Sequence, residues 1–304
     1  MIIGLFSRYS LLLMFAILSF YTSVIFSKGK TFVDTSETTD SGNTVESGSS
    51  GTAGVSKYDD GSRISGRTEA SFTQTTDENG QVINQDSGSV SAGGTDFDGT
   101  KTGGKTFAEN SQSTAEDGTQ TAENEVGASG IRKDEDGFFG DSKTSGSTGS
   151  GSITVENPDG SSTTDAFSFT NGNNENDVAK SAGKTGTESF LTLNGDGTGT
   201  LDLKVGANGN VKNQFVESSG KSSTESSLTI GANGTGSFDL IAGANGRAEA
   251  KDGSVSFSGN TEGTATGTFD EEGVVEVERT GKINGRLENE EGKFSGNAKA
   301  EATR

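Results

Sequence analysis

The chain of 304 residues contains no cysteine, no histidine and no tryptophan, and Pro158 is its only proline. Without cysteine, no disulfide can hold the fold together, even in an oxidising compartment. Without histidine and cysteine, the common general base, the thiol nucleophile and the usual zinc ligands are missing. Carboxylates alone could run glycoside hydrolysis, but few aromatic residues are available to stack on a sugar. We therefore predict a protein that is not an enzyme and has no catalytic, cofactor-binding or metal-binding residues.

Hydrophobic residues are also scarce, at 27% of the chain, whereas glycine occurs 47 times. Many of the hydrophobic residues lie in the first segment of the sequence, so the remainder is poorer still. No sustained helical spacing of apolar residues follows that segment, and the density of glycine opposes helix formation. The composition predicts either a sheet with one modestly apolar face or disorder, and not a conventional globular core.

The segment 1–27 has the features of a secretory signal peptide. Arg8 precedes an apolar run from Leu11 to Phe26, and the small residue Ser27 follows as a plausible cleavage position. The run is short for a membrane-spanning helix, although retention as an N-terminal anchor is the alternative interpretation. We expect cleavage, secretion and an extracellular location.

Acidic residues dominate the charge of the chain. The sequence has 24 Lys and Arg against 44 Asp and Glu, and loss of Arg8 with the signal peptide changes the net charge from −20 to −21. Such a charge repels nucleic acid and anionic membrane surfaces, so neither is an expected partner. Divalent cations and basic proteins are better candidates.

A repeat of 37 residues organises the second half of the chain. TESFLTLNGDGTGTLDLKVGANG begins at Thr187, and TESSLTIGANGTGSFDLIAGANG begins at Thr224. Each copy contains alternating apolar and polar residues between Asn-Gly or Asp-Gly pairs, which is the pattern of a β-hairpin. A repeat this close indicates a repeated structural unit.

Turn-forming dipeptides continue on both sides of these copies at steps near 12, 11 and 14 residues. We therefore predict three strands of eight to nine residues per repeat, and about four copies over residues 150–304. An odd number of strands makes successive copies run in opposite senses, which favours a continuous antiparallel β-meander, either open or stacked. The predicted reversals include Asn171-Gly172, Asp196-Gly197, Asn208-Gly209, Ser219-Gly220, Asn233-Gly234 and Asn245-Gly246.

The first half shows a weaker regularity. Five turn dipeptides are each 19 residues apart: Asp60-Gly61, Asn79-Gly80, Asp98-Gly99, Asp117-Gly118 and Asp136-Gly137. Over residues 59–149 this spacing predicts degenerate hairpin repeats of two short strands each, partly disordered because apolar positions are sparse. Residues 28–58 have no period, and their Ser, Thr, Gly and acidic composition predicts a flexible segment.

Two small sites remain as candidates. The run from Asn194 to Asp202 faintly resembles the glycine-aspartate rhythm of calcium-binding β-rolls, but no tandem nonapeptide is present, so calcium is only a weak expectation. Asn233-Gly234-Thr235 is a glycosylation sequon at a predicted turn, which makes Asn233 a possible N-glycosylation site.

Taken together, these features favour a secreted, acidic, Gly/Ser/Thr-rich structural or matrix-forming protein, of the kind found in silks, glues, egg coverings and cuticle. Self-association would proceed through sheet edges and thin apolar stripes. Two alternatives stay open: an extracellular binding module for calcium, carbohydrate or a basic partner, and a disordered secreted polyanion.

Overall fold

The structure is a computed structural model that describes residues 29–40, 42–97, 100–135, 141–289 and 292–303. The predicted signal peptide lies outside these residues. The described part of the chain contains β-strands and turns, and no helix in it is long and apolar enough to cross a membrane. The strands are β1 Gly29–Asp40, β2 Asn43–Lys57, β3 Arg63–Thr76, β4 Val82–Phe97, β5 Thr100–Thr114, β6 Gln120–Asp134, β7 Ser142–Glu156, β8 Ser162–Asn176, β9 Ala179–Leu193, β10 Gly199–Asn213, β11 Val216–Ile230, β12 Gly236–Ala250, β13 Val255–Asp270, β14 Gly273–Asn289 and β15 Gly292–Thr303.

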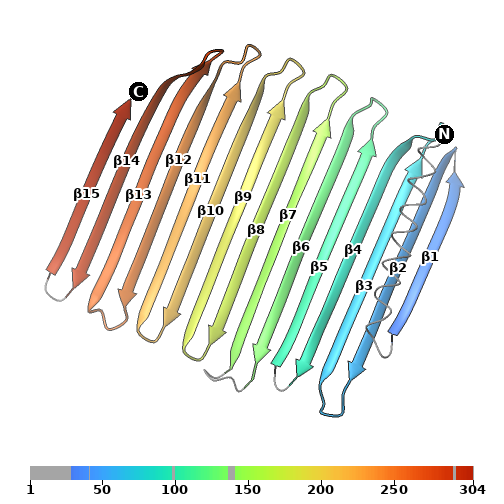
Figure 1. Ribbon diagram of the computed structural model, residues 1–304, viewed down its shortest axis with the longest axis horizontal. Coiled ribbons are helices and arrows are strands. Elements are labelled where there is room, and N and C mark those ends of the chain that lie inside the picture. The colour runs from blue at the N-terminus through green and yellow to red at the C-terminus, as the bar shows by residue number, and fades with distance from the viewer. Residues whose placement is uncertain (1–28, 41, 98–99, 136–140, 290–291, 304) are drawn as a thin grey trace. The chain divides into compact units, whose positions relative to one another are not determined.

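The chain divides into two compact units, Met1–Asp136 and Gly137–Arg304. The first contains β1 to β6 and the second β7 to β15, and in each unit the strand order follows the chain order. Consecutive strands run up and down and pair antiparallel with their neighbours (Figure 1). The predicted fold, an antiparallel β-meander of hairpin-linked strands, is therefore confirmed.

The 37-residue repeat contains two long strands, so the prediction of three short ones is wrong. β9 and β10 are each 15 residues long, and β11 and β12 repeat them 37 residues later. A five-residue turn joins β9 to β10 and β11 to β12. Two residues join β10 to β11, and the four residues 251–254 join β12 to β13. A strand of this length extends about 50 Å. With two strands per repeat, successive copies run in the same sense.

The extra predicted reversals lie inside strands, where their glycines form one continuous row. Gly209 pairs with Gly183 on one side and with Gly220 on the other, and the pairing continues across the second unit. This glycine row consists of Gly146, Gly172, Gly183, Gly209, Gly220, Gly246, Gly259, Gly285 and Gly296. An Asn-Gly pair predicts a turn from local preference alone, but here neighbouring strands hold the same residues in an extended ladder.

In the first unit, too, the strands are longer and fewer than the sequence predicted. Each 19-residue step contains one strand of 14 to 16 residues followed by one turn, instead of a two-strand hairpin. Gly61, Gly80 and Gly118 have the positive φ of the predicted turns, whereas residues 98–99 and 136–140 lie outside the described chain. Residues 29–40 and 43–57, expected to be a flexible segment, form β1 and β2. Their alternation is of Ser, Thr and Gly, which pair well in a ladder but leave no hydrophobic period to detect.

The second unit has no hydrophobic core among its described residues. Outside residues 273–275, Gly199 is the only described residue of this unit that is buried, and it has no side chain. Large apolar side chains of this unit are half-buried or exposed, as Leu201 and Leu203 show at 36% and 37%. Hydrogen bonds between the strands and contacts between neighbouring side chains therefore hold this unit together, in place of a packed interior.

Candidate functional site

The second unit has two chemically unlike faces. The register from β7 to β13 contains no bulge, so alternation of side chains is preserved across all these strands. In β8 to β13, every side chain on the face that carries the glycine row is uncharged, and we call this the uncharged face. It comprises Ser, Thr, Asn, Gly and Ala together with Leu, Val, Ile and Phe.

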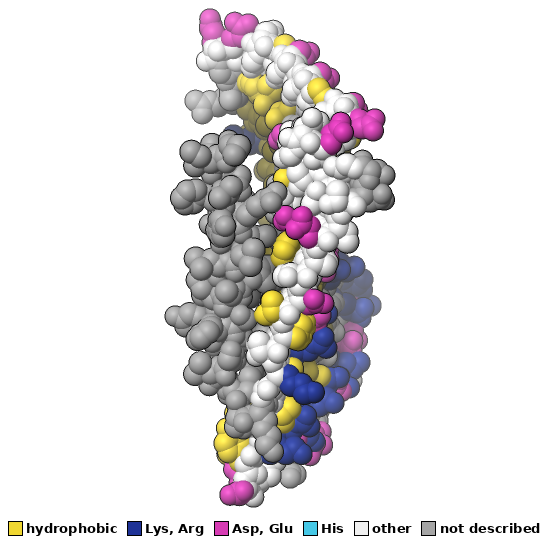
Figure 2. All heavy atoms as spheres, turned by 90° about the vertical axis from the view of Figure 1, so that its right-hand side faces the viewer, with side chains coloured by type: hydrophobic (Ala, Val, Ile, Leu, Met, Phe, Trp, Pro, Cys, Tyr) yellow, Lys and Arg dark blue, Asp and Glu magenta, His cyan; other side chains and the backbone are white. Residues whose placement is uncertain are grey.

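All charged residues of β8 to β13 lie on the opposite, charged face. In β10, for example, Leu201 and Leu203 are on the uncharged face, while Asp202 and Lys204 are on the charged face. The first unit shows the same separation in β3, β4 and β5, whose charged residues share one face. In the edge-on space-filling view, Lys and Arg side chains gather along one side of the strands (Figure 2).

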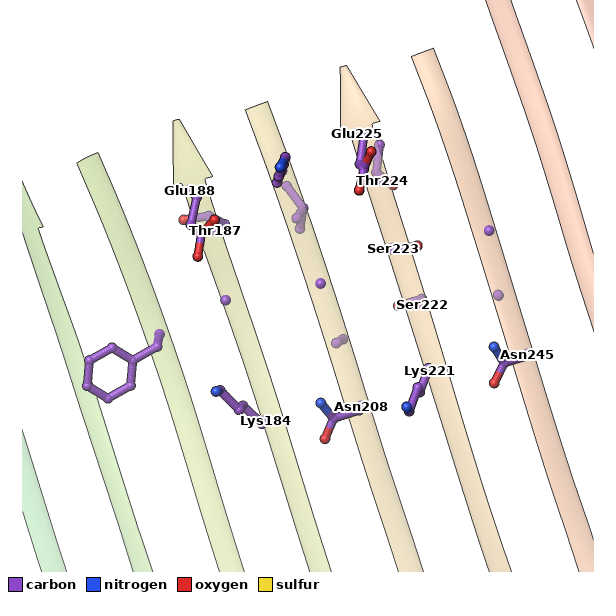
Figure 3. Close-up of a pocket in the computed structure, with 18 of the residues that line it drawn as sticks. Lys184, Thr187, Glu188, Asn208, Lys221, Ser222, Ser223, Thr224, Glu225 and Asn245 are labelled. Atoms are coloured by element: carbon purple, nitrogen blue, oxygen red, sulfur yellow. The ribbon is translucent and has the colours of Figure 1, made fainter. Parts of the chain in front are cut away.

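A shallow groove of about 970 Å³ crosses the charged face. Its floor follows a row with little or no side chain: Gly186, Gly206, Ser223 and Gly243. One wall is a row of amides and ammonium groups that contains Lys184, Asn208, Lys221 and Asn245, and the other contains Glu188, Lys204 and Glu225 (Figure 3). The walls are four residues apart along each strand, or about 13 Å. The groove can therefore offer hydrogen bonds of both polarities to an extended polar ligand.

A second row on the charged face contains paired charges. Lys212 and Glu217 lie 2.9 Å apart, Lys180 pairs with Glu175, and further pairs are Arg247–Glu249, Arg286–Glu288 and Lys293–Glu288. The hydrogen bond from Lys212 lowers the pKa of Glu217, with a further contribution from its charge. Lys180–Glu175, Lys212–Glu217 and Lys293–Glu288 join neighbouring strands, whereas the two arginine pairs each lie within one strand. All these groups are exposed, so the pairs add little stability.

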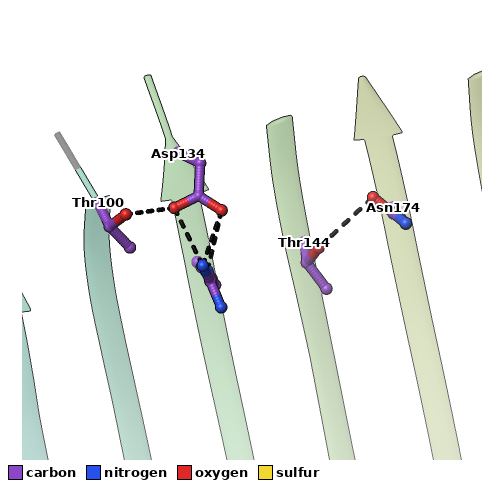
Figure 4. Close-up of polar contacts among 5 residues, drawn as sticks. Thr100, Asp134, Thr144 and Asn174 are labelled. Carbon is purple, nitrogen blue, oxygen red and sulfur yellow. Dashed lines mark hydrogen bonds and ion pairs between the residues drawn. The ribbon is translucent and has the colours of Figure 1, made fainter. Parts of the chain in front are cut away.

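Polar side chains also connect strands near their ends. In the first unit, Thr100 donates a hydrogen bond to Asp134, which also accepts from Arg132 at 3.0 Å. In the second unit, the Thr144 hydroxyl lies 3.4 Å from the Asn174 amide oxygen (Figure 4). These contacts satisfy polar groups near the ends of the strands.

The five-residue turns share one hydrogen-bonding pattern. In the turn 194–198, the N–H of Gly197 donates to the Asn194 carbonyl at 3.0 Å, and Gly197 has φ +84°. The Asp196 carboxylate accepts from the hydroxyl and the backbone N–H of Thr198, and these bonds lower the pKa of Asp196. Hydrogen bonds from the serine hydroxyl two residues further on likewise lower the pKa of Asp60 and Asp159 in turns of this length, and of Asp252 in the four-residue turn 251–254.

Asn233 replaces the aspartate in the next copy of this turn. Its side-chain oxygen accepts from the Thr235 hydroxyl at 2.7 Å and from the Thr235 N–H at 3.3 Å. Both sequon residues are thus in the predicted reversal, and the Asn233 side chain is exposed. A glycan attached there would project from the end of a hairpin.

The residues of the weak calcium hypothesis are not brought together. Asp196 is engaged in its own turn, while Asp202 lies within β10 on the charged face between Phe190 and Ser227. Over the described residues, no group of three or more Asp or Glu side chains is placed to hold a metal ion.

Sequence reasoning missed the turn 251–254, which contains Gly253, and the two-residue turns 177–178 and 214–215, which contain no glycine. Asn176 accepts hydrogen bonds from the N–H groups of Val178 and Ala179 at 2.9 and 2.7 Å. Asn213, 37 residues later, does the same for Phe215 and Val216 at 2.8 Å each. An asparagine at the same position of two successive repeats was the sequence signal for these two-residue turns. An asparagine side chain favours a turn because its oxygen can accept the hydrogen bonds that a backbone carbonyl would otherwise accept.

A search of protein-family models, curated protein sequences and solved structures finds no match to this chain.

Proposed function

We propose that this protein is a secreted structural or matrix-forming protein that self-associates through its sheet edges and thin apolar stripes, as silk, glue, egg-covering or cuticle proteins do. The observation that carries the proposal is the absence of buried hydrophobic side chains in the described second unit. A sheet with an apolar zone gains stability when a second layer covers that zone. Association supplies such a layer from outside the chain.

Strand edges add a second means of association. In the described residues, β1 and β15 each have a paired neighbour on one side only. An edge strand presents unpaired N–H and C=O groups that can accept another strand. Charged residues on β15, such as Lys293, Lys299 and Glu301, make this contact dependent on pH and salt.

Charge would regulate association. At neutral pH the net charge of −20 keeps chains apart, and the repulsion falls as pH approaches the pI of about 4.4. Divalent cations or basic proteins would act in the same direction by screening or neutralising carboxylates. Nucleic acid and, after removal of the signal peptide, membranes are not proposed partners.

The test is sedimentation velocity combined with far-ultraviolet circular dichroism on the full protein, between pH 7 and about 4.5, with and without millimolar calcium. We expect a β spectrum at neutral pH and a growing sedimenting mass as pH falls or calcium is added. A protein that stays monomeric under all these conditions contradicts the proposal. A coil spectrum throughout would instead support a disordered polyanion.

The groove on the charged face favours a second candidate function, an extracellular binding module for an extended carbohydrate. Its lysine, asparagine and glutamate side chains can donate to and accept from sugar hydroxyls, and Phe167 and Phe169 line one end. Retention on an insoluble polysaccharide, lost in Asn208→Ala and kept in the uncharged-face variant Ala207→Ser, would support this function. Equal retention of both variants would contradict it.

A further inference from the structure

Side-chain size decreases along the uncharged face of two strands of the second unit, β10 and β12. In β10 the order is Leu201, Leu203, Val205, Ala207, Gly209, and in β12 it is Phe238, Leu240, Ala242, Ala244, Gly246. β9 and β11 also begin this series with a leucine and end it at the glycine row, with Ser and Thr between. The register aligns the large ends, because Leu201 pairs with both Leu191 and Leu228. We call Leu191, Leu201, Leu228 and Phe238 the leucine row.

We propose that this uncharged face pairs with the same face of a second copy, turned about a two-fold axis that crosses the strands near Val205. The leucine row of each copy then covers the glycine row of the other. This inference rests on the proposed self-association and specifies its partner and its geometry.

The decrease in size explains the orientation. Stacked sheets pack about 10 Å apart, and their side chains must fill that space evenly. Turning the second copy about an axis across the strands places the leucine row of β9 to β12 opposite glycine, so in these four strands the facing residues have a similar combined height. Turning it about an axis along the strands would oppose leucine to leucine and glycine to glycine, which leaves a wedge-shaped gap.

The charge pattern explains why a second copy can bind despite the net charge of the chain. Pairing through the uncharged face of β8 to β13 removes no charged side chain from water, so the desolvation penalty of a buried charge does not oppose it. The charged faces point outward, on opposite sides of the pair, where salt screens their repulsion.

The area is sufficient for a specific dimer. Six strands from β8 to β13 cover about 29 Å, and the nine residues from Leu201 to Gly209 cover about 27 Å. The resulting flat area of roughly 750 Å² per copy is close to the roughly 800 Å² per partner of a standard protein interface. A contact made of the same patch on both copies closes with two-fold symmetry and does not propagate. Further growth would then use the strand edges.

Cysteine cross-linking tests the orientation directly, because the chain has no cysteine of its own. Leu201→Cys is at the tall end of β10 and Gly209→Cys at the low end, where an added Cβ meets only the Ala182 carbonyl oxygen at 3.5 Å. With a bis-maleimide that spans about 10 Å, a mixture of the two variants should cross-link into dimers far more efficiently than either variant alone. The control pair, Asp202→Cys and Asn208→Cys, lies on the charged face and should not cross-link. Equal yields on both faces, or no cross-linking of the first pair, would overturn the inference.

A matched pair of substitutions tests the energetics. Leu240→Glu and Ile241→Glu change adjacent residues of β12 that are 38% and 50% exposed, and they alter the net charge equally. We expect Leu240→Glu to raise the dimer dissociation constant at least tenfold and Ile241→Glu to change it little, with unaltered circular dichroism for both. Equal dissociation constants for the two variants would contradict face pairing.

A third variant separates this inference from the proposed function. Ala300→Pro removes a backbone donor from β15, the last described strand. If Ala300→Pro abolishes association while Leu240→Glu leaves it unchanged, face pairing fails and self-association through edges stands. If the unmodified protein never associates, both fail.

Discussion

The ring of Phe107 lies over Gly127, its direct partner on the neighbouring strand. A Cβ atom added at Gly127 would lie 2.3 Å from Cε1 of that ring, well inside van der Waals contact. The same opposed pairing recurs at Phe32–Gly51, Phe72–Gly48, Phe169–Gly149, Phe238–Gly267 and Phe269–Gly236. Covering a strand glycine with an aromatic ring shields backbone that would otherwise be exposed. In a protein poor in hydrophobic residues, this contact recovers apolar burial locally.

Gly127→Ala should therefore destabilise the first unit. The ring of Phe107 must leave its position, and such overpacking costs about 1 to 3 kcal/mol. Gly130→Ala in the same strand is the control, because its added Cβ would meet only the Gly103 carbonyl oxygen at 3.7 Å. That change should be neutral or stabilising by about 0.5 to 1 kcal/mol. Urea denaturation followed by circular dichroism measures both, and equal effects would contradict the role of the ring.

The turn glycines should tolerate substitution less well than the members of the glycine row. Gly197 has φ +84°, so Gly197→Ala should cost about 1 to 2 kcal/mol from backbone strain alone. Gly209→Ala, in the extended glycine row, should not show this loss. Thermal denaturation of the two variants provides the comparison. A smaller loss for Gly197→Ala than for Gly209→Ala would be incompatible with the turn geometry.

Stability should fall at acidic pH because of the turn carboxylates. Hydrogen bonds lower the pKa of Asp196 in the folded state below its ordinary value of 3.8. Such a group stabilises the fold above its unfolded-state pKa, and this contribution disappears as pH falls through the lower, folded-state pKa. We expect the melting temperature to decrease below about pH 4 and Asp196→Asn to decrease less steeply, since Asn233 makes the same hydrogen bonds without titrating. Melting curves from pH 6 to 3 are the measurement. Parallel curves for the two proteins would refute this assignment.

Asn233 should carry a glycan when the protein is produced by secretion from eukaryotic cells. The sequon lies in an exposed turn, where an oligosaccharide displaces no packed side chain. A single reduction in gel mobility, reversed by an amidase that removes N-linked glycans, is the expected result. Asn233→Gln and Thr235→Ala should each abolish it, whereas Asn194→Gln should not, because Asp196 occupies the third sequon position there. A mobility shift that persists in Asn233→Gln would show modification elsewhere.

The local sequence was enough to predict β-strands and several of the turns between them. It was not enough to predict how long the strands are, because strand length depends on pairing with neighbouring strands. Asp196-Gly197 and Asn208-Gly209 look alike in sequence, yet the first reverses the chain and the second lies in the middle of β10. What distinguishes them is the partner strand: Gly209 faces Gly183 and Gly220, and a row of this kind becomes visible only once the register is known. The turn preferences of Asn-Gly and Asp-Gly pairs therefore predicted too many turns. The strands predicted between those turns were too short.

The site was predictable only in outline. The alternation of Leu201, Asp202, Leu203 and Lys204 indicates one apolar and one polar face for a single strand. The complete absence of charge from the uncharged face, and the decrease in side-chain size along it, depend on how adjacent strands are aligned. The groove likewise requires Gly186, Gly206 and Gly243, which are far apart in sequence, to fall in one row.

The two-strand content of the repeat bears on how such a chain can change in length. Because each 37-residue unit enters and leaves at the same end of the sheet, a tandem duplication or deletion of one unit widens or narrows the sheet by about 10 Å and leaves every row intact. Gain or loss of one strand would instead place leucines against glycines within the same layer and move the five-residue turns to the other end. Length variants of the gene in steps of 37 codons are therefore the ones that this architecture accommodates.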